Sequence, residues 1–229
     1  HALARLSQAM VSPASQSGHE DIQQFIAALP KAELHVHLEG SVDADTLWEL
    51  ACRQKSALAD GGREQAEQLF RTTRFLDFLQ AFKTICLHLN SPEDYELIAY
   101  RALERMARQN VRYTEMILSA GVMVWRGQQI EPLFRGAVRG AQQAAREFGI
   151  QARWLFDAVR QFPLEQGWQV VRCAAELMDE GVVGIGIGAS LYRHVAGDPT
   201  PHQASVHWHL HDSGLAPSVR VTGTGVASL

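Results

Sequence analysis

The apolar residues of this chain switch repeatedly between helical and strand spacing from residue 20 to residue 188. Alternating or wholly apolar runs, which indicate strands, occupy residues 33–38, 111–118, 150–157 and 182–187. Apolar residues at helical spacing fill the intervals over residues 21–29, from about 43, and over 74–89, 92–109, 130–148 and 164–180. This alternation predicts a parallel sheet with helices outside it. An open doubly wound sheet and part of an eight-stranded barrel both satisfy the pattern, although no G-x-G-x-x-G of a dinucleotide-binding fold follows the first strand.

Both ends of the chain differ from this patterned region. Residues 1–19 are rich in Ser, Ala and Gln, and we expect a mobile tail without a packed role. Residues 189–229 contain no Lys and no Glu and keep no regular period, and the Gly- and Ser-rich stretch 219–229 predicts disorder. We therefore divide the chain into a disordered tail (1–19), one domain (20–188) and an unassigned segment (189–229).

The composition excludes several classes of protein. With 21 basic and 25 acidic side chains the net charge is −4, which gives no electrostatic footprint for nucleic acid or an anionic membrane. No uncharged stretch reaches the about 20 residues of a membrane span, and residues 1–19 lack the apolar centre of a signal peptide. Three cysteines, odd in number and far apart, fit a reducing cytoplasm rather than a disulfide framework. The chain begins with His rather than Met, so we expect that its true beginning is missing.

Two histidines stand two residues apart in the first predicted strand. Side chains at positions i and i+2 of a strand point to the same face, so His35 and His37 leave one side of the strand near its carboxyl end. Two imidazoles held in this way can chelate one divalent ion, and nitrogen ligands favour zinc. Two ordinary histidines in a half-buried strand explain the H-x-H pair equally well. Glu39, two residues further along, either faces solvent or accepts a hydrogen bond from a polar ligand.

The residues around this pair resemble the signature P-K-x-E-L-H-x-H-L-[DE]-G of the adenosine deaminase-like branch of the amidohydrolase superfamily. The matching residues, 29–41, read LPKAELHVHLEGS. Three later segments match in order, namely FLDFLQAF (75–82), NVRYTEMILSAG (110–121) and GVVGIGIG (181–188). Ile117 stands where arginine is common in the family, and Ala189 where a second glycine is preferred. The resemblance covers roughly residues 20–188.

This resemblance implies an α/β fold, the N-terminal half of a (β/α)8 TIM barrel, with about four parallel strands, outer helices and one zinc ion per chain. It implies an adenosine deaminase-like hydrolase, acting on cyclic amidines, that removes the exocyclic amine of a purine nucleoside. His35 and His37 would be zinc ligands, and His37 would also touch the substrate. Glu39 would bond the ribose hydroxyls, and the backbone of Gly188 would approach the purine.

The resemblance also assigns a role to two phenylalanines one helical turn apart. Phe78 and Phe82 would form an apolar lid over the sugar, although ordinary core packing explains such a pair as well. Later parts of the family pattern, an H-A-G-E-like motif with the general acid, another histidine and an Asp-Asp pair, do not occur in this sequence. We therefore expect the catalytic acid, a Glu, in a missing half, because the residues after Gly188 are too few for four more strands.

The composition of the chain changes where the resemblance stops. We therefore interpret residues 189–229 as an out-of-register tail, produced by a frameshift or an assembly error in the coding sequence. A rival interpretation starts from His207, His209 and His211, which alternate in H-W-H-L-H and on a strand would share one face. These three imidazoles would then complete a metal site, whereas an exposed histidine-bearing loop is the simpler alternative.

Three hypotheses about function remain from the sequence. The first is a truncated and impaired deaminase of a purine nucleoside, with adenosine as the default substrate and aminodeoxyfutalosine, an intermediate of a menaquinone route, as the alternative. The second is a metal- or purine-binding remnant without turnover, and the third is a structural α/β domain. The implied partner is a small-molecule purine nucleoside, with neither nucleic acid nor membrane. A half-barrel also exposes strand edges, so we expect self-association in a cytoplasmic protein.

Overall fold

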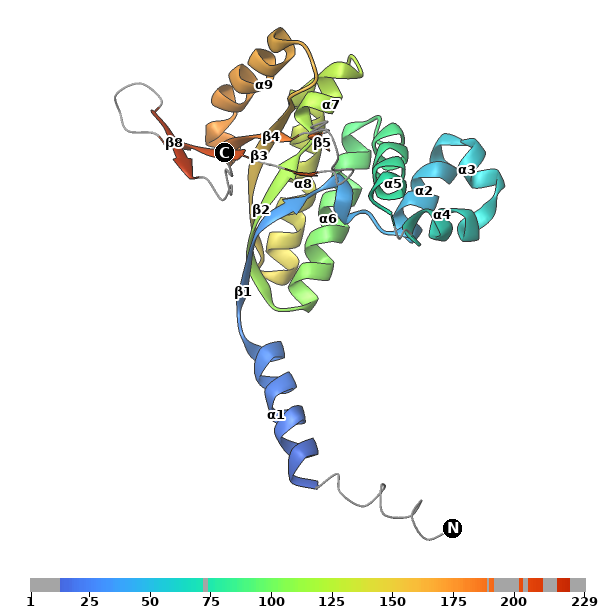
Figure 1. Cartoon of the computed structure of the whole chain (residues 1–229), viewed down its shortest axis with the longest axis vertical. Helices are drawn as coiled ribbons and strands as arrows, with labels where there is room; N and C mark the ends of the chain where they lie inside the picture. The colour runs from blue at the N-terminus through green and yellow to red at the C-terminus, as the bar shows by residue number, and fades with distance from the viewer. Residues whose placement is uncertain are drawn as a thin grey trace, which may run out of the picture.

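The computed structural model describes residues 13–71 and 74–188, together with the strand segments 190–191, 202–203, 206–211 and 218–222. Its central element is a six-stranded sheet in the order β1-β2-β3-β4-β7-β8. The first four strands are parallel, namely β1 (Lys31–His37), β2 (Val111–Leu118), β3 (Gln151–Val159) and β4 (Val182–Gly188). The predicted run of parallel strands is therefore confirmed, and its carboxyl ends lie along one edge of the sheet (Figure 1).

Helices connect the parallel strands and cover the sheet. They are α1 (Pro13–Ala28), α2 (Ala44–Gln54), α3 (Ala57–Asp60), α4 (Gly62–Phe70), α5 (Phe75–Leu87), α6 (Pro92–Arg108), α7 (Ala120–Trp125), α8 (Ile130–Phe148) and α9 (Leu164–Glu176). Figure 1 shows α2 to α5 gathered beyond the carboxyl end of β1, with α6 and α8 packed side by side behind the sheet. Two short 3-10 turns, Glu39–Ser41 and Met178–Glu180, follow β1 and α9.

Local chemistry explains where the main helices begin and end. The hydroxyl of Ser91 accepts from the backbone of Asp94, and the Asp94 carboxylate accepts from the backbone of Ser91, so a complete capping box starts α6. Asp43 caps α2 by accepting from the backbone N–H of Thr46 at 2.8 Å. Gly149 ends α8 in the left-handed conformation, with φ at 70°.

The core lies between the sheet and the helices α6 and α8. Its largest fully buried side chains include Trp154 and Phe156 of β3, Met116 of β2 and Phe134 of α8. The Phe134 ring meets the rings of Trp154 and Phe156 edge-on, at centroid distances of 5.7 and 5.0 Å. This packing holds the centre of the sheet rigid, so the side chains at the strand ends sit on a fixed base.

Two glycines of α8, Gly136 and Gly140, allow this helix to lie close to α6. A Cβ atom placed on Gly136 would lie 2.0 Å from the carbonyl oxygen of Pro92, the first residue of α6. No side chain fits at that distance, so the close approach of the two helices depends on glycine at this position.

Several elements differ from the sequence predictions. Helix α1 begins at Pro13, inside the stretch predicted as a tail, because proline suits the first position of a helix. Helix α7 was not predicted, since its residues AGVMVW are too short and too uniformly apolar to reveal a period. Residues 219–222, in the stretch 219–229 for which disorder is expected, belong to β8 (Ser218–Thr222).

The segment after β4 contributes further strands to the described fold. β7 (Val206–His211) pairs antiparallel with β4, and β8 pairs antiparallel with β7. Two shorter strands, β5 (Ser190–Leu191) and β6 (His202–Gln203), pair with each other. Of the two strand edges expected to be exposed, that of β4 is therefore covered, and β1 and β8 are the outer strands of the described sheet.

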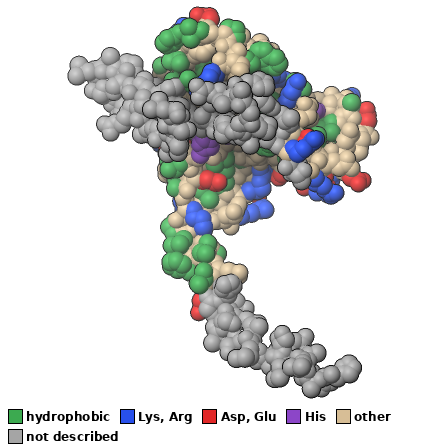
Figure 2. Space-filling view, viewed as in Figure 1, with side chains coloured by type: hydrophobic (Ala, Val, Ile, Leu, Met, Phe, Trp, Pro, Cys, Tyr) green, Lys and Arg blue, Asp and Glu red, His purple; other side chains and the backbone are tan. Residues whose placement is uncertain are grey.

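Helix α1 projects from the body below the start of β1 (Figure 1). Its apolar side chains form the green surface that Figure 2 shows where this helix joins the body. Ile22, Phe25, Ile26 and Leu29 are 41–63% exposed. No helix in the described part of the chain has both the length and the apolar character that a bilayer span needs.

Candidate active site

His35 and His37 leave the carboxyl-terminal half of β1 close together. Their ring centroids are 5.5 Å apart, with an interplanar angle of 64°. His35 is exposed, whereas His37 is partly buried. Behind His37, its backbone carbonyl accepts a hydrogen bond of 2.9 Å from the Ser41 hydroxyl, which anchors the turn that follows the strand.

The spacing of these two rings is compatible with one shared metal ion. Two imidazoles on a tetrahedral zinc, with Zn–N bonds of about 2.0–2.1 Å, hold their ring centres about 5 Å apart. The observed 5.5 Å is close to that value. No third His, Cys, Asp or Glu joins them within the described residues to complete a metal-binding group. The two histidines therefore fit part of a zinc site, and further ligands have to come from elsewhere.

Glu39 is fully buried at the end of β1, so the alternative in which it faces solvent is wrong. Its Oε1 accepts a 2.9 Å hydrogen bond from the backbone N–H of Ser119, and its Oε2 accepts one of 3.0 Å from the Ser119 hydroxyl. Burial raises the pKa of Glu39, and the bonds from Ser119 lower it in part. Since Ser119 directly follows β2, this contact joins the ends of the first two strands and fixes the carboxylate in one orientation.

The two phenylalanines of α5 lie beside His37. The Phe82 ring meets the His37 ring edge-on at a centroid distance of 6.3 Å, and the Phe78 ring lies 6.3 Å from the Phe82 ring. Phe78 is 44% exposed, so it is not an ordinary core residue, whereas Phe82 is half-buried. A small apolar cavity of about 80 Å³ adjoins both rings and reaches Gly40 and Phe70.

Asp157 was not singled out from the sequence, yet it lies near the predicted site. It occupies the end region of β3, is 7% exposed, and its Oδ1 has no hydrogen-bond partner in the part of the chain that the structure describes. Burial raises the pKa of Asp157 to about 7, assisted by the nearby charge of Glu39 and opposed by the backbone N–H of Gly188. The sequence signal that could have found it is an acidic residue at the end of the apolar run WLFD (154–157).

Gly188 ends β4 next to this carboxylate. A Cβ atom at position 188 would lie 2.3 Å from Oδ2 of Asp157, so a side chain there would force the carboxylate to move. The structure therefore brings His37, Glu39 and Gly188 to the carboxyl ends of their strands, at one edge of the sheet. It adds Asp157 and Ser119 to them.

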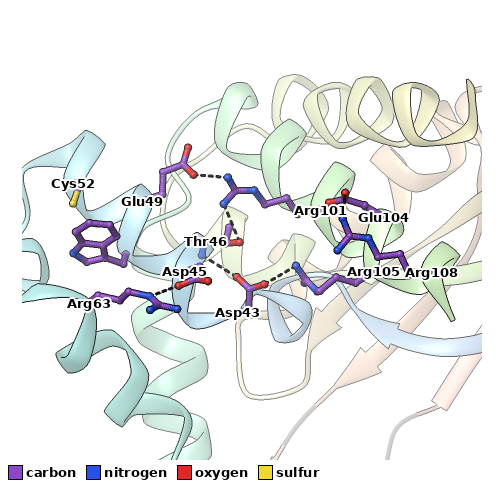
Figure 3. Close-up of a pocket in the computed structure, with 11 residues that line it drawn as sticks. Asp43, Asp45, Thr46, Glu49, Cys52, Arg63, Arg101, Glu104, Arg105 and Arg108 are labelled. Carbon is purple, nitrogen blue, oxygen red and sulfur yellow. Dashed lines mark hydrogen bonds and ion pairs between the residues drawn. The ribbon is translucent and has the colours of Figure 1, made fainter. Parts of the chain in front are cut away.

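A larger cavity, of about 530 Å³, lies between α2, α4 and α6 and contains none of the predicted site residues (Figure 3). Its lining is charged, and the dashed lines of Figure 3 mark contacts between opposite charges. Arg101 donates to Glu49 at 2.5 Å, Arg105 donates to Asp43 at 2.8 Å, and Arg63 contacts Asp45. These pairs connect α2 to its neighbours, which indicates a structural role for the cavity wall.

The backbone places the later histidines on a strand, the arrangement that the rival metal-site interpretation requires. His207, His209 and His211 alternate along β7, with His207 opposite Gly186 and His209 opposite Gly184 in β4. Their side chains lie outside the described residues, so the metal-binding interpretation stays a prediction.

Comparison with known proteins identifies the family. The family model for adenosine deaminase matches residues 30–214, past the point where the motif resemblance ends. The aminodeoxyfutalosine deaminase of Streptomyces avermitilis is 36% identical over 177 residues, covering 76% of this chain and 49% of the relative. The adenine deaminase of Wolinella succinogenes is 25% identical over 173 residues, covering 76% and 52%. The chain thus spans about half the length of the curated relatives it matches.

Solved structures show the same architecture. An amidohydrolase from Burkholderia ambifaria with bound Zn matches with a TM-score of 0.61 at 29% identity, covering 77% of this chain and 48% of that one. The adenine deaminase of Arthrobacter aurescens matches in fold with a TM-score of 0.63 at 24% identity, covering 70% and 49%. The four parallel strands with their helices thus form the N-terminal half of a (β/α)8 barrel, as predicted. Because the adenosine deaminase model matches most of its length, including the strand with the H-x-H pair, this chain belongs to the adenosine deaminase family.

Proposed function

We propose that this chain is part of a zinc-dependent hydrolase that removes the exocyclic amino group of a 6-aminopurine nucleoside. The observation that carries the proposal is the pair of imidazoles on β1, His35 and His37, with ring centroids 5.5 Å apart. They lie at the carboxyl end of a parallel strand, where the active sites of (β/α)8 barrels are built. The buried carboxylate of Glu39 follows on the same strand end.

Each of these residues has a part in the proposed reaction. His35 and His37 would hold the metal, which when bound supplies Lewis-acid activation of water at neutral pH. Glu39 would accept hydrogen bonds from the sugar hydroxyls, because Ser119 fixes its orientation while each carboxylate oxygen keeps further acceptor capacity. Phe78 and Phe82 would cover the sugar and exclude bulk water.

The catalytic acid and a third metal ligand are not assigned to any described residue. Catalytic zinc sites normally use three protein ligands, and the described side chains offer no such group. We propose that both are supplied by the part of the barrel that the relatives have and this chain does not span. On its own, the chain is then expected to bind the nucleoside but to hydrolyse it slowly or not at all.

The substrate is proposed as adenosine, with a second candidate that one observation favours. Relatives named aminodeoxyfutalosine deaminase are 34–36% identical to this chain, compared with 25–28% for those named adenine deaminase. The residues of the proposed site would face groups shared by both nucleosides. We also propose a cytoplasmic location, because Cys52, Cys86 and Cys173 are all free thiols.

The proposal is tested by measuring ammonia release and nucleoside binding on one preparation of the zinc-supplemented chain. Adenosine, aminodeoxyfutalosine and adenine are the ligands, and the variants are His37→Ala and Glu33→Ala. Glu33 is exposed and lies on β1 before the histidines, so its variant is the matched control. The proposal is supported if the wild-type chain binds a nucleoside, the His37→Ala variant does not, and the Glu33→Ala variant still does. Ammonia release distinguishes an active chain from a binding remnant, and the absence of both binding and release contradicts the proposal.

A further inference from the structure

Asp157 carries a polar atom whose burial nothing in the described fold explains. The residue is 7% exposed, and its Oδ1 has no hydrogen-bond partner among the described residues. Burying a polar oxygen without a partner destabilises the folded state, because the oxygen loses its hydrogen bonds to water. Native proteins pair nearly all such atoms, and the exceptions require an explanation, such as a bound ligand.

The other oxygen of the same carboxyl group is held in place. Oδ2 lies against Gly188, where a Cβ atom would come within 2.3 Å of it, and the backbone N–H of Gly188 interacts with the carboxylate. Asp157 is therefore anchored on one side by the end of β4, and Oδ1 is the oxygen that has no hydrogen-bond partner among the described residues.

The position of Asp157 connects it to the proposed site. It lies at the end region of β3, between Ser119 at the end of β2 and Gly188 at the end of β4 in the order of the sheet. Ligands of barrels and open parallel sheets bind outside the carboxyl ends of the strands. Glu39 is near enough for its charge to act on Asp157, so the two carboxyl groups border the same region.

We infer that Asp157 is a substrate-binding residue, whose Oδ1 forms a hydrogen bond with one polar group of the purine nucleoside. This inference rests on the proposed function and adds a contact to it. Oδ1 can accept from a sugar hydroxyl, or donate to a ring nitrogen when the carboxyl is protonated.

The inference is tested by calorimetric binding to the whole zinc-supplemented chain. The ligands are adenosine and six analogues that each lack one sugar hydroxyl or one ring nitrogen: 2′-deoxyadenosine, 3′-deoxyadenosine, 5′-deoxyadenosine, 1-deazaadenosine, 3-deazaadenosine and 7-deazaadenosine. The variants are Asp157→Ala and the isosteric Asp157→Asn, and the matched control is Asp179→Asn, an exposed carboxylate that follows α9. Circular dichroism checks the fold, and the Asn variant serves if the Ala variant does not fold.

Asp157→Ala is expected to weaken adenosine binding about tenfold or more, as the loss of a buried hydrogen bond does. For the analogue that lacks the partner group, the same substitution is expected to change the affinity less than about twofold, since no bond remains to lose. The analogue that shows this insensitivity identifies the sugar hydroxyl or ring nitrogen involved. Asp179→Asn is expected to leave every affinity unchanged.

Two results overturn the inference while leaving the proposed function intact. One is unchanged adenosine binding by both Asp157 variants. The other is an equal loss of affinity for adenosine and all six analogues, which indicates a structural effect on the whole site. Failure of the wild-type chain to bind any of these nucleosides is a different outcome, because it contradicts the proposed function together with the inference.

Discussion

The ring of Phe82 stands edge-on to the ring of His37, with centroids 6.3 Å apart and an interplanar angle of 88°. This contact ties α5 to the end of β1, and Phe78 extends it by a further ring toward solvent. Helix α5, which begins nearly 40 residues after the end of β1, therefore forms one wall beside the proposed metal ligands. The wall is aromatic, which suits it to cover a sugar or a flat base.

Replacing Phe82 with alanine is expected to weaken nucleoside binding about threefold to tenfold, because an aromatic contact contributes about 0.5–1.5 kcal/mol beyond its buried area. Calorimetric titration with adenosine measures the change. Leu87→Ala is the matched control, since Leu87 lies on the same helix and is 49% exposed. Equal affinities for the Phe82 variant and the wild type would show that this ring does not cover the ligand.

The stability of the chain is expected to depend on the ionisation of Asp157. Burial and the charge of Glu39 raise the pKa of Asp157 from 3.8 to about 7 in the folded chain. Between these two values the folded state holds a proton that the unfolded state releases, so the free energy of unfolding falls as the pH rises. The slope is at most about 1.4 kcal/mol for each pH unit, and it vanishes above the folded pKa.

Urea unfolding of the zinc-free chain between pH 5 and pH 8 measures this slope. Asp157→Asn is expected to flatten it, while a smaller slope remains from Glu39, whose pKa is also raised. Asp179→Asn, the exposed control, is expected to retain the wild-type slope. The account of Asp157 is wrong if its Asn variant and the wild type lose stability equally over this range.

Arg105 is expected to stabilise the turn behind the histidines. It donates to the carbonyl oxygen of Ser41 and, at 2.8 Å, to the carboxylate of Asp43. Its side chain is 33% exposed, so solvent screens the pair and Arg105→Gln is expected to cost only about 1 kcal/mol. Chemical unfolding measures the loss, and faster amide exchange over residues 37–42 reports the loosened turn.

The control for this substitution lies one turn along the same helix. Arg108 pairs with Glu104 and is 72% exposed, so Arg108→Gln is expected to cost less than about 0.5 kcal/mol. If both arginine variants lose the same stability without altered exchange over the turn, the positioning role of Arg105 is refuted.

Gly136→Ala is expected to destabilise the chain by about 2–3 kcal/mol, because the added methyl group would overlap the backbone of Pro92 and push α8 away from α6. Gly167→Ala is the matched control, since a Cβ atom there meets nothing within 4 Å. That change in α9 is expected to be stabilising by about 0.5–1 kcal/mol, from helix propensity. Thermal unfolding of both variants measures the contrast, and a neutral effect at Gly136 would contradict the close helix contact.

The parallel strands could be predicted because their apolar runs are bounded by local signals. The predicted strand over 111–118 and the predicted helix over 130–148 match the structure residue for residue, since Asn110 and Gly149 punctuate the chain there. Ser91, the N-cap residue, likewise marks the start of α6. Helix α7 escaped prediction because its short apolar sequence has no polar face, and its burial is set by packing against β3 and α9.

The site was predictable only where its residues are close in sequence. His35, His37 and Glu39 share one strand end, so their spacing reveals a common location. Glu39 is bonded to Ser119, which is 80 residues away, and Asp157 of β3 lies against Gly188 of β4. Such contacts arise from the register of the sheet, which no local pattern encodes.

The central claim is that His35 and His37 bind the same zinc ion. Anomalous diffraction at the zinc edge, from crystals of the zinc-supplemented chain, tests it most directly. The account predicts one peak about 2.0–2.1 Å from a ring nitrogen of each histidine. Rings that diverge into separate environments, with no peak between them at full zinc supplementation, would contradict the claim and with it the proposed deaminase site.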